Sequence, residues 1–154
     1  MSEPTSIVAD ADVLAAALLV DGDAREALAA IREHSWLTLV ASDELLADAA
    51  AVIATLADED LAADWRDRIE AERVAVDQPA GDHPGLASAY RGDAAHLLTF
   101  DEDLASAQAG LSLQPHADLS VRSPGAFVRV FDAAALYEAT HDDAYPGPDR
   151  DPLA

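Results

Sequence analysis

The sequence contains no cysteine and no lysine. Without cysteine, a thiol nucleophile, a zinc knuckle and a disulfide framework are excluded. All nine basic residues are arginine, which excludes a Walker-type phosphate loop and any mechanism through a lysine Schiff base or a lysine general base. Long apolar runs are absent too: the longest, Val13–Val20, is far shorter than a membrane span, and no basic leader precedes it. We therefore expect a cytoplasmic protein that does not enter a membrane.

Positive charge is scarce, with 9 basic against 30 acidic residues and a formal charge of −21. A chain this acidic repels itself and repels polyanions in dilute salt. However, 51% of the residues are apolar, so the composition is not that of a disordered acidic segment. A foldable core within a lysine-free, acidic surface indicates a halophilic protein from a salt-adapted organism, because in molar salt the Debye length falls to about 3 Å. Acidity therefore does not exclude RNA as a partner.

The 154 residues suit one domain. Short apolar runs alternate with helical patterns, which predicts a three-layer α/β/α fold of the Rossmann type, with a central parallel sheet of about four or five strands. We place this domain at 1–138 and expect the acidic, Pro-rich tail 139–154 to be disordered. The expected strands are 6–9, 36–40, 74–76, 96–100 and 119–121. The expected helices are 13–19, 23–34, 42–56, 58–72, 86–91, 104–109 and 124–136.

Two of the expected strands end in an aspartate, Asp10 and Asp101, and a further aspartate follows each, Asp12 and Asp103. In open α/β sheets, ligands bind beyond the carboxyl ends of the strands, where the strand order reverses. If the two strands are neighbours, the carboxylates meet there and need a cation, and hard oxygen ligands select Mg²⁺ or Mn²⁺. Such a site suits metal-assisted hydrolysis of a phosphodiester. Each aspartate also precedes a helix, so a helix cap is the structural alternative for any one of them.

The segments Ile7–Leu14 and Leu97–Leu104, together with Ser42–Asp48 between them, resemble a PIN domain in their order along the chain. The resemblance covers residues 7–130. PIN domains are metal-dependent nucleases that act mostly on RNA, and many are toxins paired with an antitoxin. The resemblance implies an endoribonuclease that uses Mg²⁺ or Mn²⁺, with four metal-binding catalytic acids: Asp10, Asp48, Asp82 and Asp101. Further acids that it leaves open as ligands are Asp12, Glu44 and Asp103.

The second acidic position departs from the family pattern, because PIN domains usually carry glutamate there and Asp48 is shorter. One alternative is therefore a PIN-like module that keeps the fold and serves in binding or regulation. A lesser alternative is a phosphatase of the haloacid dehalogenase type, since Asp10-Ala11-Asp12-Val13 resembles the nucleophile motif of that family. An arginine would have to replace its phosphate-pairing lysine. The helices expected over 42–72 also leave a homodimer open.

Overall fold

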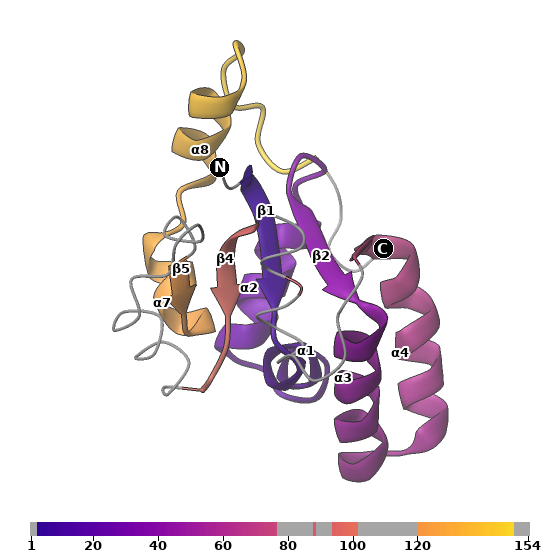
Figure 1. Cartoon of the computed structure of the whole chain (residues 1–154). Coiled ribbons are helices and arrows are strands. Elements are labelled where there is room, and N and C mark those ends of the chain that lie inside the picture. Colours follow the sequence, from indigo (N-terminus) through magenta and orange to yellow (C-terminus); the bar gives the residue numbers. More distant parts are fainter. Residues whose placement is uncertain (1–2, 77–87, 89–93, 102–119, 150–154) are drawn as a thin grey trace.

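The computed structural model describes residues 3–76, 88, 94–101 and 120–149. Five strands form one sheet in the order β3-β2-β1-β4-β5, and every neighbouring pair is parallel. Helices flank this sheet, and the three-layer α/β/α fold with a parallel sheet is thereby confirmed (Figure 1). The strands are β1 (Glu3–Ala9), β2 (Thr38–Ser42), β3 (Val74–Val76), β4 (Ala94–Leu98) and β5 (Ser120–Arg122).

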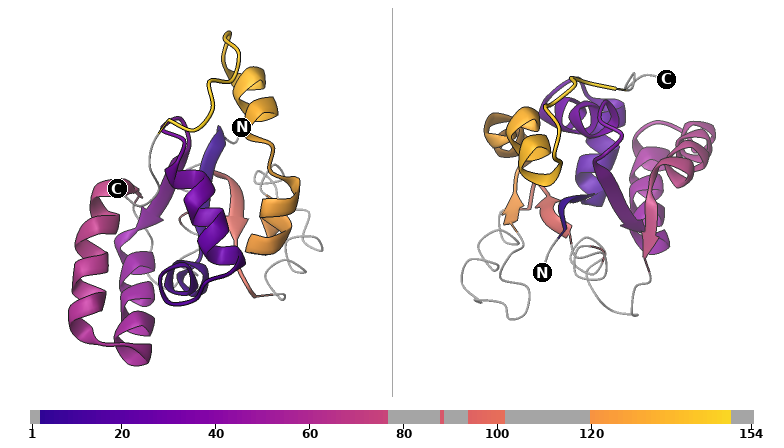
Figure 2. Two further views of the ribbon diagram at one scale, coloured as in Figure 1. Left: turned by 180° about the vertical axis from the view of Figure 1, so that it is seen from behind. Right: turned by 90° about the horizontal axis from the view of Figure 1, so that it is seen from above.

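Six helices are described: α1 (Ala11–Leu19), α2 (Asp23–Arg32), α3 (Asp43–Leu56), α4 (Glu59–Glu72), α7 (Pro124–Val130) and α8 (Ala133–Thr140). Seen from behind, α2 lies across the sheet with α7 beside it, while α3 and α4 run side by side at one edge (Figure 2). No helix in the described part of the chain is both long and apolar enough to cross a bilayer.

The central strand β1 is buried on both faces, with Ile7, Val8 and Ala9 at most 1% exposed. Such burial explains why the sequence there is a continuous apolar run and not an alternating one. The run stops at Asp10, whose backbone is still extended and whose side chain accepts a hydrogen bond from the Ala11 amide at the start of α1. The strand therefore ends by delivering a carboxylate to the carboxyl edge of the sheet.

The order of strands reverses between β1 and β4. From β1 the chain moves outward through β2 to β3, and then returns to the other side of β1 with β4 and β5. Ala9 pairs with Leu98, and the Asp10 amide donates to the Leu98 carbonyl at 2.8 Å. The strand before Asp10, β1, and the strand before Asp101, β4, are therefore neighbours. This is the condition under which the two carboxylates can share a site.

The prediction of a single last helix over 124–136 is wrong, because the structure has two helices, α7 and α8, in that region. The chain leaves helical geometry at Phe131 and restarts after Asp132, whose side chain accepts from the Ala135 amide and caps α8. At this break the Phe131 ring stacks on Phe127, with centroids 5.0 Å apart. Aromatic packing and a new cap thus outweigh the continued apolar pattern.

The described part of the C-terminal segment contacts the loop after α2. Tyr145 Oη lies 2.6 Å from His34 Nε2, and His34 Nδ1 lies 2.7 Å from the Ala30 carbonyl. Because a carbonyl only accepts, Nδ1 carries the proton, and in the neutral ring Nε2 accepts from the tyrosine hydroxyl. Asp149 adds bonds to the amide and hydroxyl of Ser35. Tyr145 and Asp149 belong to the tail 139–154 that the sequence analysis expects to be disordered. Residues 150–154 of this tail lie outside the described residues.

Candidate functional site

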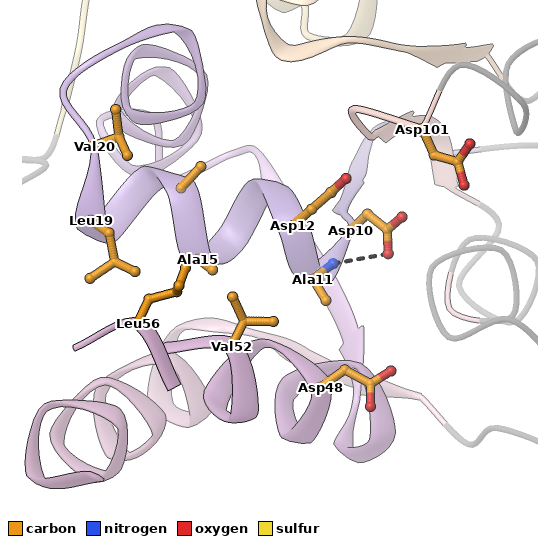
Figure 3. A pocket seen from close by; sticks show the side chains of 11 residues that line it. Asp10, Ala11, Asp12, Ala15, Leu19, Val20, Asp48, Val52, Leu56 and Asp101 are labelled. Carbon is orange, nitrogen blue, oxygen red and sulfur yellow. Dashed lines mark hydrogen bonds between the residues drawn. The ribbon is translucent and has the colours of Figure 1, made fainter. Parts of the chain in front are cut away.

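A pocket of about 530 Å³ opens at the carboxyl edge of the sheet, between α1 and α3 (Figure 3). Its two ends differ in chemistry. The acidic end is lined by four aspartates, Asp10, Asp12, Asp48 and Asp101. The apolar arm, which extends from there between the two helices, is lined by Ala15, Ala16, Leu19, Val20, Val52 and Leu56. Carboxylates from α1, from α3 and from the residues that follow β1 and β4 thus line one cavity, although these segments span some ninety residues of the sequence.

Thr99 links the two strand-end aspartates. Its hydroxyl donates to Asp10 Oδ2 at 2.9 Å and accepts from the Asp101 amide at 3.1 Å. Both Asp10 and Thr99 are buried, at 7% and 3% exposure, while the Asp101 side chain is exposed. The role of Thr99 was not anticipated from the sequence, although its position between a buried strand and an aspartate was a usable signal. Thr99 therefore sets the orientation of the Asp10 carboxylate and the backbone that carries Asp101.

Asp12 has one carboxylate oxygen in use and one without a described partner. Oδ2 accepts from the Phe100 amide at 3.2 Å, whereas Oδ1 is buried and has no hydrogen-bond partner among the described residues. Burial raises the pKa of this carboxyl, the Asp10 and Asp101 charges raise it further, and backbone hydrogen bonds partly oppose them. A buried carboxylate oxygen without a described donor is costly to keep ionised, and a proton or a cation there would offset that cost.

The two helix positions considered for the second acid are separated by the structure. Both residues are exposed, but Asp48 lines the pocket from α3, whereas Glu44, one turn earlier, is not among the described lining residues. The remaining predicted acids, Asp82 and Asp103, lie outside the described residues. Four of the seven acids named from the sequence are therefore brought to one pocket.

The donor set at the acidic end fits a hard divalent cation. All of its described side chains are carboxylates, the ligands that Mg²⁺ and Mn²⁺ prefer, and Asp12 Oδ1 is a buried oxygen without a partner. Within the described ranges, however, no group of three or more acidic or histidine side chains is arranged to hold an ion. Asp48 faces the strand-end aspartates from across the pocket (Figure 3), so a shared ion would require these side chains to draw together.

Comparison with known proteins places the chain in a family. A family model described as a family of unknown function (DUF7384) matches residues 1–153. The chain belongs to this family. No curated protein and no solved structure is significantly similar to it. The function of this DUF7384 chain must therefore be argued from the pocket itself.

The raised pKa of Asp12 predicts how the metal-free DUF7384 protein responds to pH. The folded state favours the protonated carboxyl, so this stabilisation is complete below the ordinary pKa of 3.8 and is lost as pH rises through the raised value. Asp12→Asn removes that loss. We expect the variant to melt higher than the wild type at neutral pH by a few degrees, since 1 kcal/mol is worth about 2–4 °C at this size.

Melting curves between pH 4 and pH 7 check this, with chelator present throughout. The difference between variant and wild type should shrink towards zero as the pH falls to about 4. A constant difference across that range, or a less stable variant at pH 7, would contradict it.

The start of α3, which carries Asp48, is held by two buried serines. Ser42 caps the helix, its hydroxyl accepting from the Leu45 amide at 3.1 Å. The Ser42 amide donates in turn to Ser88 Oγ at 3.1 Å, and both residues are 0% exposed. Ser88 is thus fixed against the helix that forms one wall of the pocket.

Ser88→Ala should destabilise the DUF7384 protein measurably. The substitution removes the buried hydrogen bond from the Ser42 amide to Ser88 Oγ, and the loss of one such bond costs about 1 kcal/mol. Chemical denaturation of the two proteins measures the difference. Ser123→Ala, which removes an exposed helix cap hydrogen bond, provides the comparison. A loss for Ser88→Ala below about 0.5 kcal/mol, within the range of ordinary surface changes, would show that this contact does not hold α3.

Proposed function

We propose that this protein is a Mg²⁺- or Mn²⁺-dependent ribonuclease of PIN type. The observation that carries the proposal is the meeting of Asp10 and Asp101 at the strand-order reversal, joined through Thr99. The buried oxygen of Asp12 without a described partner supports it, because it provides a further place for positive charge. An ion held by such carboxylates supplies an activated water and stabilises the leaving oxygen of a phosphodiester.

Each described residue has a distinct task in this proposal. Asp10 and Asp101 would hold the ion from adjacent strand ends, with Asp48 as a further ligand from α3. Asp12 holds the Phe100 amide through Oδ2 and so positions the backbone between Thr99 and Asp101. Thr99 keeps the Asp10 carboxylate in one orientation, so that its oxygens are presented before the ion arrives. Asp82 stays a predicted ligand, because it lies outside the described residues.

The pocket favours a metal-dependent reaction over a covalent one at Asp10. None of the described lining residues is basic, so none of them could pair with the phosphate of a phosphorylated aspartate. Both Asp10 oxygens also accept hydrogen bonds, from the Ala11 amide and the Thr99 hydroxyl. The described pocket therefore supports the nuclease hypothesis better than the phosphatase hypothesis.

A non-catalytic PIN-like module is the second candidate. One specific observation favours it: the described acidic side chains are not gathered tightly enough to hold an ion in this structure. Such a module would keep the pocket for binding alone. The two candidates differ in whether a divalent ion stabilises the fold.

A manganese titration in molar potassium chloride tests the proposal. At a free ion concentration a hundred times the dissociation constant, binding stabilises the folded state by about 2.7 kcal/mol, which corresponds to a rise in melting temperature of about 5–10 °C. RNA cleavage should appear over the same range of manganese and disappear with chelator. A flat melting temperature and no cleavage, with the protein folded, would favour the non-catalytic module.

A further inference from the structure

The last described part of the chain is bound to the rest of the fold without any buried residue of its own. We call residues 133–149, which are α8 and the segment that follows it, the C-terminal strap. None of these residues is buried. A segment with few buried apolar contacts and exposed hydrogen bonds opens at a lower free-energy cost than the core. The strap is therefore the part of the described structure that should separate first.

Aromatic rings join the strap to the segment that precedes β2. The Trp36 ring packs edge-on against Tyr137 and His141, with ring centroids 5.2 and 5.9 Å apart. Further along the strap, the Tyr145 hydroxyl is hydrogen-bonded to His34, which is itself 2% exposed. The surroundings of Trp36 therefore depend on whether the strap is docked.

The end of the strap brings negative charges together. Asp149 binds the amide and hydroxyl of Ser35 through its carboxylate, and its own amide donates to the Glu33 carbonyl at 2.9 Å. Burial raises the pKa of the Tyr145 hydroxyl, and the Glu33 and Asp149 charges raise it further. Two carboxylates thus act on one point of the docked strap, and they repel each other across it.

The charge of the strap makes its docking sensitive to salt. The strap has four acidic residues and no arginine, the next two residues, Arg150 and Asp151, add no net charge, and the whole chain has a formal charge of −21. The Debye length is about 30 Å at 0.01 M salt and about 3 Å at 1 M. Repulsion between the strap and the rest of the chain is therefore long-ranged in dilute salt and screened in molar salt.

We propose that the C-terminal strap is a salt-controlled latch, which undocks from the folded protein as the ionic strength falls and docks again as it rises. α8 contributes Ala135 and Leu136 to a second cavity, of about 350 Å³. His96 and Phe127 line the same cavity from β4 and α7. Undocking therefore removes one wall of this cavity and uncovers the ring of Trp36. The latch does not depend on the proposed nuclease, because the strap binds ahead of β2 and the acidic pocket lies beyond the carboxyl ends of the strands.

Fluorine NMR of the full chain labelled with 5-fluorotryptophan tests the latch at fixed pH. The chain has two tryptophans: Trp36 contacts the strap, whereas Trp65, 6% exposed on α4, reports on the core. As potassium chloride is lowered from molar to millimolar concentration, the Trp36 signal should change while the Trp65 signal keeps its folded position. Loss of one signal in Trp36→Phe assigns the two.

A pair of charge variants shows whether repulsion of the strap is the cause. Asp142→Asn/Asp143→Asn removes half of the acidic residues of the strap and none of its described hydrogen bonds. Asp64→Asn/Asp67→Asn removes as much charge from exposed positions on α4, across the molecule from α8 (Figures 1 and 2). The first pair should lower the salt concentration at which Trp36 responds by at least about twofold, since it halves the repulsion at a given Debye length. The second should change it far less.

A second pair of variants tests the docking contact itself. Tyr145→Phe removes the hydrogen bond to His34 and should lower the docking equilibrium constant by about fivefold, so that the strap undocks at higher salt. Tyr137→Phe keeps the ring beside Trp36 and removes a hydroxyl that makes no described hydrogen bond, so it should behave as the wild type.

Several results would overturn the latch. A Trp36 signal that stays constant into dilute salt, or that changes only together with Trp65, would show that the strap does not undock from a folded core. Equal shifts for the two asparagine pairs would assign the salt effect to the total charge and not to the strap. Docking of Tyr145→Phe at the same salt concentration as the wild type would show that the contact with His34 does not hold the strap.

Discussion

Asp10→Asn should abolish manganese-dependent stabilisation and lower RNA cleavage by more than about a hundredfold. Loss of a residue that merely orients a metal ligand typically costs 10- to 100-fold, so loss of a ligand itself should exceed that range. The amide keeps one oxygen, which can still accept from the Ala11 amide, and asparagine caps a helix as well as aspartate does. The fold should therefore persist. The negative charge of the pair Asp10 and Asp101, which attracts the ion, is halved. Melting temperature with and without manganese, and the rate of RNA cleavage, measure both effects.

Asp58→Asn is the matched control for this substitution. Asp58 also caps a helix, accepting from the Leu61 amide at 2.7 Å, but it is exposed and lies outside the pocket. It should respond to manganese as the wild type does. Asp101→Asn should reproduce the loss seen for Asp10→Asn if both carboxylates hold the same ion. A full manganese response in Asp10→Asn would refute the site, whatever the cleavage rate.

Thr99→Val should lower manganese affinity and RNA cleavage by about 10- to 100-fold, the range for residues that orient a ligand. Valine has nearly the same shape but no hydroxyl, so the hydrogen bond from Thr99 to Asp10 Oδ2 and the one from the Asp101 amide to Thr99 are both lost. Because Thr99 is 3% exposed, water cannot simply replace these bonds. A hydrogen bond to a charged group contributes about 1.5–3 kcal/mol, so a lower melting temperature accompanies the loss.

Thr99→Ser separates orientation from packing. Serine retains the hydroxyl and removes a methyl group, so it should restore most of the manganese affinity even if it restores less stability. Thr140→Val, which alters an exposed hydroxyl bonded within α8, should change neither. If Thr99→Ser binds manganese as poorly as Thr99→Val, the threonine acts through packing and not through its hydrogen bonds.

Helix starts and the central strands were predictable because their causes are local. Ser42 and Asp58 begin α3 and α4 by capping the first turn with their own side chains, and the strand at Val74–Val76 was expected within the same bounds. The strands expected at 36–40 and 96–100 are each displaced by two residues, since β2 is Thr38–Ser42 and β4 is Ala94–Leu98. An apolar run marks burial, but the ends of a strand depend on the partner strand with which it pairs.

The candidate site was predictable in its residue types and less so in its geometry. Asp10 and Asp101 follow from strand ends, and the pairing of β1 with β4 confirms that these ends are adjacent. Asp48 was favoured over Glu44 on resemblance alone, and the structure places Asp48 in the pocket wall. The hydrogen bonds of Thr99 and the apolar arm were not predicted, because both depend on how helices and strands far apart in the sequence pack against one another.

The sequence by itself determined the acidic, cysteine-free character of this protein, its alternating strands and helices, and the aspartates that end its strands. These properties reside in composition, in period and in caps that act within a few residues. The tertiary structure decided that β4 returns beside β1, that α3 faces α1 across a cavity, and that one oxygen of Asp12 is buried without a described partner. Each of these depends on contacts between segments far apart in the chain, where packing and desolvation, and not local preference, set the free energy.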